Sequence, residues 1–106
     1  MKISTGCTAL DWIADKAVFT TTEEYEDETH PYECWDQFVF TGTLNRKMVR
    51  QIRAWIDGAR RNVGTNYHMD HCRLTIDGVR YEFDCRMPSD SKVDYDKSWI
   101  MILRYK

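Results

Sequence analysis

Long apolar runs are absent from this 106-residue sequence, and that absence excludes several classes of protein. No stretch approaches the roughly 18 consecutive apolar residues that a membrane-spanning helix requires. Asp11 and Asp15 interrupt the segment near the N-terminus that would otherwise resemble the apolar part of a secretory signal. Four cysteines are too few for a disulfide scaffold at this length, so we expect free thiols. Together these absences predict a cytoplasmic protein.

Catalytic signatures are missing as well. The sequence has no glycine-rich phosphate loop, no nucleophile elbow and no HExxH zinc motif. Cys72 with His68 or His71 is the one candidate for a thiolate nucleophile. Because side chains alternate between the two faces of a strand, His71 is expected on the opposite face from Cys72. We therefore expect a protein that is not an enzyme, with no catalytic residues and no cofactor.

Charge is abundant, and its two signs are unevenly distributed along the chain. The sequence has 17 acidic and 15 basic side chains, for a net charge of −2. Residues 1–45 contain nine acidic side chains and two lysines, whereas residues 46–106 contain thirteen basic and eight acidic side chains. This polarity, a balance of −7 in the first part and +5 in the second, is the most informative feature of the composition.

The clearest single element is an amphipathic helix over residues 45–64. Its apolar side chains recur at helical spacing and gather on one side. Asn45 is placed to cap the first amides, and Gly64 to take the left-handed position that follows the last turn. The apolar side consists of Met48, Val49, Ile52, Trp55, Ile56, Ala59 and Val63.

A second clear element is a hairpin over residues 71–86. Asp77-Gly78 stands between two alternating runs, which is the signature of a two-residue turn between paired strands. That turn pairs Cys72 with Phe83 on an apolar face. The opposite face receives charge-matched pairs, namely Thr75 with Arg80, Arg73 with Glu82 and His71 with Asp84.

The remaining segments complete a single α+β domain over residues 1–106. Residues 17–25 and 35–41 are rich in β-branched and aromatic side chains and predict a second hairpin. The apolar run 99–103 predicts a strand that is covered on both faces or that lies near the centre of the sheet. We expect an antiparallel sheet of about five strands with the main helix packed on one face. Residues 8–16 predict a short N-terminal helix, with an edge strand over residues 1–5 as the alternative.

The predicted hairpin of residues 17–41 is strongly acidic. Seven of the fourteen side chains from Glu23 to Asp36 are acidic, and none is lysine or arginine. Carboxylates this dense repel one another, which favours a surface that a basic partner neutralises, and they imitate the charge spacing of a phosphate backbone. The alternative is a solvated tip whose charge prevents edge-to-edge aggregation. The candidate partner-binding residues, with aromatic anchors among them, are Glu23, Glu24, Tyr25, Glu26, Asp27, Glu28, Tyr32, Glu33, Trp35 and Asp36.

The outward side of the main helix is basic. A row of basic side chains can follow the phosphates of a nucleic acid. Against this interpretation, the overall charge is negative and no homeodomain, zinc-finger or RNP signature is present. A solvated face or pairing with the acidic hairpin are the alternatives. The candidate nucleic-acid-binding residues are Arg46, Lys47, Arg50, Arg53, Arg60 and Arg61.

Histidine and cysteine also occur at spacings that suggest zinc ligands. His30 and Cys34 are four residues apart, as are His68 and Cys72, and Cys85 shares a predicted sheet face with Cys72. In a strand, however, four residues span about 13 Å at ~3.3 Å per residue, which is too far for one ion. Cys72 and Cys85 fit better as small core residues, and we expect no bound metal.

The sequence as a whole favours binding over catalysis. We expect a small inhibitor whose acidic hairpin engages a basic, nucleic-acid-binding surface of a host protein in the manner of a DNA mimic. Small acidic domains without a catalytic motif are typical of phage or mobile-element proteins that block host defence. Two alternatives stay open. One is a nucleic-acid-binding module that uses the main helix, and the other is a structural subunit that self-associates through Trp35 or Trp99.

Overall fold

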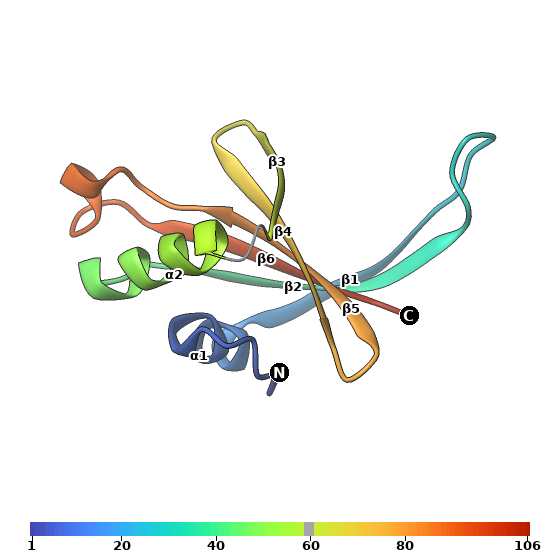
Figure 1. Ribbon diagram of the computed structural model, residues 1–106, viewed down its shortest axis with the longest axis horizontal. Helices are drawn as coiled ribbons and strands as arrows, with labels where there is room; N and C mark the ends of the chain where they lie inside the picture. The colour runs from blue at the N-terminus through green and yellow to red at the C-terminus, as the bar shows by residue number, and fades with distance from the viewer. Residues whose placement is uncertain (59–60) are drawn as a thin grey trace.

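The structure, a computed structural model, describes residues 1–58 and 61–106 and shows two helices on one face of a six-stranded antiparallel sheet (Figure 1). The strand order is β1-β2-β6-β5-β4-β3. The last strand therefore lies inside the sheet, as its apolar run predicts. The expected α+β class is confirmed. In chain order the elements are α1 (Thr8–Lys16), β1 (Val18–Tyr25), β2 (Glu33–Gly42), α2 (Arg46–Gly58), β3 (Asn62–Asn66), β4 (Met69–Ile76), β5 (Val79–Arg86), a 3-10 turn (Asp90–Lys92) and β6 (Ser98–Tyr105).

The amphipathic pattern of α2 places its apolar side against the sheet. The Asn45 side chain accepts a hydrogen bond from the Met48 amide at 2.9 Å, so the predicted N-cap is confirmed. The indole of Trp55 lies edge-on against the Phe83 ring of β5, with 5.7 Å between ring centroids. The α2 residues buried in the core are Val49, Ile52, Trp55 and Ile56.

The prediction of where the main helix ends is wrong. The helix was expected to reach Gly64 with Val63 on its apolar side, yet α2 ends at Gly58 and Val63 and Gly64 lie exposed in β3. Residues 62–66 pair instead with the free edge of β4, and this tertiary pairing outweighs local helical periodicity. The sheet therefore has six strands where about five were expected. Ala59 and Arg60, also assigned to the helix, lie outside the described residues.

The N-terminal helix, α1, forms over residues 8–16 as predicted. Its first turn is organised by Asp11, whose carboxylate accepts hydrogen bonds from the amide and hydroxyl of Thr5 at 2.8 and 2.7 Å. The N-cap residue, Cys7, makes no capping hydrogen bond with its side chain. Residues 1–5 form no edge strand. Within the described residues, neither helix has the length and apolar character needed to cross a bilayer.

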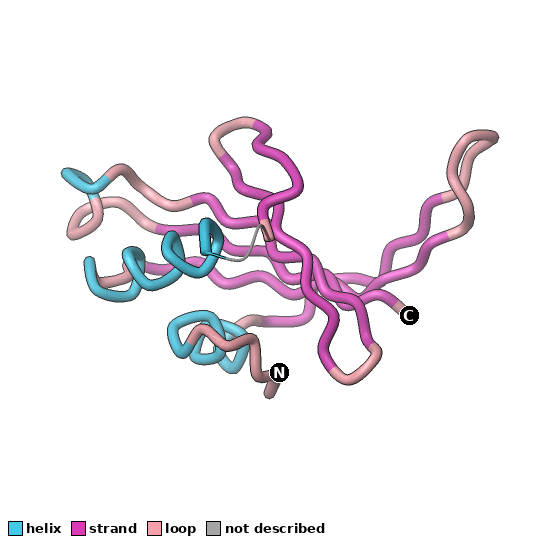
Figure 2. Tube along the Cα trace, viewed as in Figure 1, coloured by secondary structure: helices cyan, strands magenta, loops and turns pink. Residues whose placement is uncertain are grey.

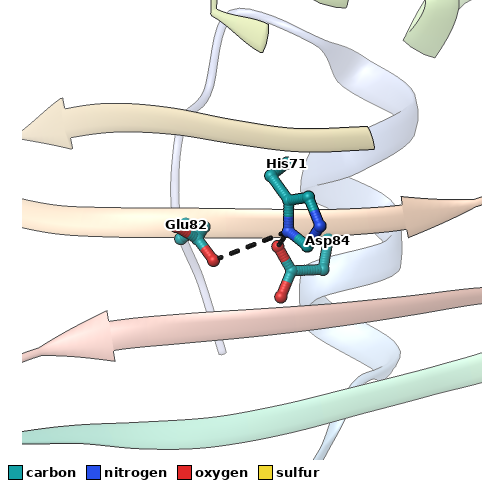
Figure 3. A group of neighbouring side chains, drawn as sticks. All are labelled: His71, Glu82 and Asp84. Atoms are coloured by element: carbon teal, nitrogen blue, oxygen red, sulfur yellow. Dashed lines mark hydrogen bonds and ion pairs between the residues drawn. The ribbon is translucent and has the colours of Figure 1, made fainter. Parts of the chain in front are cut away.

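The β4–β5 hairpin has the predicted register. Cys72 lies opposite Phe83 and His71 opposite Asp84, with Asp77 and Gly78 in the turn at φ of 50° and 79°. Cys72 and Phe83 face the helices and are fully buried. His71 and Asp84 consequently project from the other face of the sheet, which neither helix covers and which we call the open face (Figures 1 and 3).

Gly78→Val is expected to destabilise the protein through its backbone alone. A Cβ at Gly78 meets no atom within 4 Å, but φ of +79° is a conformation that L side chains rarely adopt. The expected loss is about 1–2 kcal/mol for the left-handed conformation, and more for a β-branched residue. Gly64→Val is the matched control, because that glycine also has open space and needs no positive φ. Equal melting temperatures for the two variants would contradict the turn assignment.

Candidate functional site

The β1–β2 hairpin projects beyond the rest of the sheet. β2 pairs with β6 from Gly42 to Trp35, where Trp35 lies opposite Tyr105, and one further backbone bond joins Lys106 to Cys34. Past this point the two strands of the hairpin pair only with each other, ending at Tyr25 opposite Glu33. Figures 1 and 2 show the resulting arm reaching away from the body, with loop 26–32 at its end. The acidic segment is therefore presented clear of the core.

Asp27 organises the loop at the end of this arm. Its carboxylate accepts hydrogen bonds from the amide and hydroxyl of Thr29 at 2.8 and 2.9 Å. His30 Nδ1 lies 2.9 Å from the same carboxylate, and the Tyr25 hydroxyl donates to it as well. The hydrogen bond from Tyr25, followed by those from His30 and Thr29, lowers the pKa of Asp27 well below its usual value. Asp27 therefore keeps its charge and holds the loop in one shape.

Tyr32 on the opposite strand makes a similar bond. Its hydroxyl donates to Glu24 at 2.9 Å, and this bond, together with neighbouring Cys34, raises the pKa of Tyr32 to about 12. The two tyrosines keep their rings in solvent all the same, with 49% of Tyr25 and 56% of Tyr32 exposed. Exposed aromatic rings held by a hydrogen bond are suited to bury area against a partner with little loss of rotamer freedom.

The acidic residues fall into two groups with different electrostatic surroundings. Those at the end of the arm, which we call the acidic tip, form no ion pair with any arginine or lysine of residues 1–58 and 61–106. His30, which lies 2.9 Å from Asp27, is the one basic group of the described residues that reaches them. All five carboxylates of the acidic tip are exposed. The acidic tip consists of Glu23, Glu24, Glu26, Asp27 and Glu28.

The other acidic residues of the arm are neutralised where it joins the sheet. Glu33 accepts a hydrogen bond from Arg80 at 2.6 Å, and Asp36 lies 3.0 Å from Arg104 and 3.5 Å from Lys106. These pairs tie β2 to the sheet, so the two carboxylates are less available to an outside partner than those of the acidic tip.

Trp35 belongs to the same inner part of the arm. Its ring lies tilted against Tyr105 with 5.5 Å between centroids, and the residue is half-buried on the open face. Its indole N–H is buried and has no hydrogen-bond partner among the described residues. Trp99 is also half-buried, with the Arg86 guanidinium 5.8 Å from its ring centroid. Neither tryptophan presents a fully exposed ring for self-association.

The basic side of α2 lies at the other end of the molecule and is occupied within the chain. Arg46 lies 3.3 Å from Asp94 and 3.7 Å from Asp90, and Arg50 lies 3.2 Å from Asp90. Both carboxylates come from loop 87–97, which runs beside α2 (Figure 1). Among residues 1–58 and 61–106, the acidic arm and the basic helix therefore form no ion pair with each other, which was the pairing that the sequence left open.

The remaining basic candidates differ in how available they are. Arg53 donates to the backbone oxygen of Pro88, and Arg61 donates to that of Trp55 while its guanidinium lies over the indole ring. Lys47 is exposed and makes no ion pair with the described residues. Arg60 lies outside the described residues.

The histidines and cysteines considered as zinc ligands are not brought together. His30 is bonded to Asp27 in the tip loop, and His68 lies exposed in the β3–β4 turn. Cys72 and Cys85 are buried under the helices, where burial raises the pKa of the Cys72 thiol to about 12. The four cysteines are free, and Cys34 is half-buried. A buried, protonated Cys72 is a core residue and not a nucleophile.

His71, Glu82 and Asp84 form a cluster on the open face. The sequence predicts the cross-strand pairs to which these residues belong, but not that the three side chains meet. His71 Nδ1 lies 2.7 Å from Asp84 Oδ1 and 3.9 Å from Glu82 Oε2 (Figure 3). The sequence predicts the cross-strand pairs but not their burial, because an alternating pattern marks this face as solvated. Asp84 is 3% exposed and Glu82 is 9% exposed. Burial, and then the neighbouring Glu82, raise the pKa of Asp84 to about 7, although His71 acts in the opposite direction.

Comparisons with known proteins identify no relative. A scan against family models, a search of curated proteins and a search of solved structures each found no match. Function is therefore inferred from the geometry and charge of the chain itself.

Proposed function

We propose that the protein is a small, non-enzymatic inhibitor that binds another protein through its acidic tip. The observation that carries this proposal is the five-carboxylate tip, which projects from the sheet without any lysine or arginine of the described chain to neutralise it. Concentrating like charge on a two-stranded arm costs stability through repulsion. A partner with a complementary basic surface removes that cost on binding, which favours a role in recognition.

The partner best matched to the acidic tip is a protein with a basic, nucleic-acid-binding groove. The tip combines closely spaced carboxylates with two half-exposed tyrosine rings, so it can replace phosphates electrostatically and fill apolar gaps between basic side chains. Occupying such a groove blocks the nucleic acid that normally binds there. An inhibitor of host defence carried by a phage or mobile element, acting in the cytoplasm, is the biological setting we propose.

The alternative of a nucleic-acid-binding module on α2 has less support. Four of its six candidate residues are engaged inside the chain, Arg46 and Arg50 by aspartates and Arg53 and Arg61 by backbone oxygens. A nucleic acid would have to compete with those contacts for the same guanidinium groups. Lys47 is the one described candidate without such a contact.

A capture experiment with the tagged 106-residue chain tests the proposal. Bacterial lysate is passed over the immobilised protein with and without nuclease, and bound proteins are eluted with a rising salt gradient. We expect a partner that is retained after nuclease treatment and elutes as salt screens the charges. Retention that disappears with nuclease would show that nucleic acid is the ligand and would favour the α2 alternative.

A further inference from the structure

We propose that His71, Glu82 and Asp84 bind one divalent transition-metal ion, with Zn²⁺ as the best fit, on the open face of the sheet. This site is separate from the acidic tip and does not depend on the function proposed for it. The three side chains come from neighbouring strands, His71 from β4 and both carboxylates from β5, and they project on the same side (Figure 3).

The spacing of the donor atoms suits a single small ion. One donor atom of each side chain lies within 4.8 Å of the others. His71 Nδ1 is 2.7 Å from Asp84 Oδ1 and 3.9 Å from Glu82 Oε2. Ligands at about 2.0–2.2 Å from a tetrahedral zinc ion lie about 3.4 Å from one another. The two observed separations bracket that value, so small side-chain rotations bring all three atoms to coordination distance.

Burial gives the cluster a reason to hold a cation. Asp84 and Glu82 are 3% and 9% exposed, and they are neighbours on one face of β5. One donor oxygen of each carboxylate lies within 4.8 Å of the other, and two buried carboxylates this close repel each other strongly when both are ionised. His71 is the one basic group within ion-pair distance of Asp84 among the described residues. A dication bound by all three side chains neutralises both carboxylates at once.

The arginine next to the cluster leaves the proposed ligands free. Arg73 lies opposite Glu82 and donates from Nε to Oε1 at 3.1 Å. The other oxygen, Oε2, is the one that faces His71. Arg73 can therefore keep its bond to Oε1 and orient the carboxylate while Oε2 coordinates the ion, as outer-shell partners commonly do.

The donor set and its exposure select the class of metal. One imidazole nitrogen with two carboxylate oxygens suits Zn²⁺ better than Ca²⁺ or Mg²⁺, which prefer oxygen ligands throughout. The His71 side chain is 24% exposed, so the cluster reaches solvent on one side. Three protein ligands then leave a coordination position for water.

Metal titration of the 106-residue chain tests this inference. After treatment with a chelator, the protein is titrated with ZnCl₂ at about pH 7.5, and binding is followed by calorimetry. We expect one ion per chain, with Asp84→Asn and His71→Gln each weakening affinity by about tenfold or more. His68→Gln is the matched control, because that histidine is exposed in the β3–β4 turn, and it should leave affinity unchanged.

Cobalt separates this site from adventitious binding by thiols. CoCl₂ should give visible ligand-field bands, without the near-ultraviolet charge-transfer band of a thiolate ligand, and His71→Gln should remove them. If Asp84→Asn does not fold, His71→Gln alone decides the question. Absence of stoichiometric binding, equal affinity in His71→Gln and wild type, or a thiolate band lost in Cys34→Ser would each overturn the proposal. The cluster would then be an ion-pair network without a metal.

Discussion

Changing Glu23, Glu26 and Glu28 to lysine is expected to abolish capture of the partner. These three carboxylates lie on the acidic tip, are exposed and make no hydrogen bond or ion pair within the described residues. Each substitution converts an attraction for a basic surface into a repulsion, and we expect affinity to fall by about a hundredfold or more. Asp27 is left unchanged because its bonds hold the tip loop together. Affinity is measured by surface plasmon resonance at several salt concentrations.

A matched variant separates local charge from net charge. Asp15, Asp57 and Asp96 are also exposed, but they lie on α1, on α2 and in loop 87–97. Their change to lysine alters the net charge by the same amount and should leave binding nearly intact. Equal loss in both variants would mean that overall charge, and not the arm, controls association. Unchanged binding in the tip variant would remove the basis of the proposed function.

Trp55→Ala is expected to lower the free energy of unfolding by about 3–5 kcal/mol. The indole is 8% exposed and packs edge-on against Phe83, so it joins α2 to the centre of the sheet. Its N–H also donates to the backbone oxygen of Thr5 at 3.0 Å, which fastens the N-terminal segment. Removing the ring leaves a cavity and an unpaired carbonyl. Since a domain of this size is stable by only about 5–15 kcal/mol, the variant should unfold at much lower urea concentration.

The exposed tryptophan of α1 provides the comparison. Trp12 is 46% exposed and lies edge-on to Phe40, with 5.9 Å between ring centroids. Trp12→Ala removes the same indole side chain from a site that is already half exposed to solvent. We therefore expect the free energy of unfolding to fall by only about 1 kcal/mol. If the two variants unfold at the same urea concentration, Trp55 is not the helix–sheet contact described above.

Much of the fold can be predicted from residue patterns because local and tertiary preferences agree. In the β4–β5 hairpin, Asp77-Gly78 specifies the turn, and that turn fixes a register that also matches apolar and charged pairs. The β3–β4 hairpin lacks such a signal. Its turn residues, Tyr67 and His68, take φ of 52° and 61° although neither is glycine or asparagine. Pairing of β3 with β4 imposes this conformation, and no local sequence pattern predicts the turn.

The candidate sites were predictable to different extents. The acidic tip is visible in the sequence because its charge is contiguous, but its separation into exposed and neutralised carboxylates depends on Arg80 and Arg104, which are distant in the chain. Similarly, the aspartates that occupy the basic side of α2 lie some forty residues away. The alternating pattern of β5 marks the face of Asp84 as solvated, so it does not predict that this side chain is only 3% exposed.

The two outermost strands determine how this molecule behaves when crowded. β3 spans five residues, and β1 is interrupted by a register shift between Phe19 and Thr21 before it enters the acidic arm. Short or irregular outer strands offer a neighbouring copy no straight row of free amides and carbonyls to extend. Mutual repulsion between arms adds to this effect. We therefore expect the protein to stay dispersed at high concentration and low ionic strength, and to become prone to fibrous growth only when acid titrates its carboxylates.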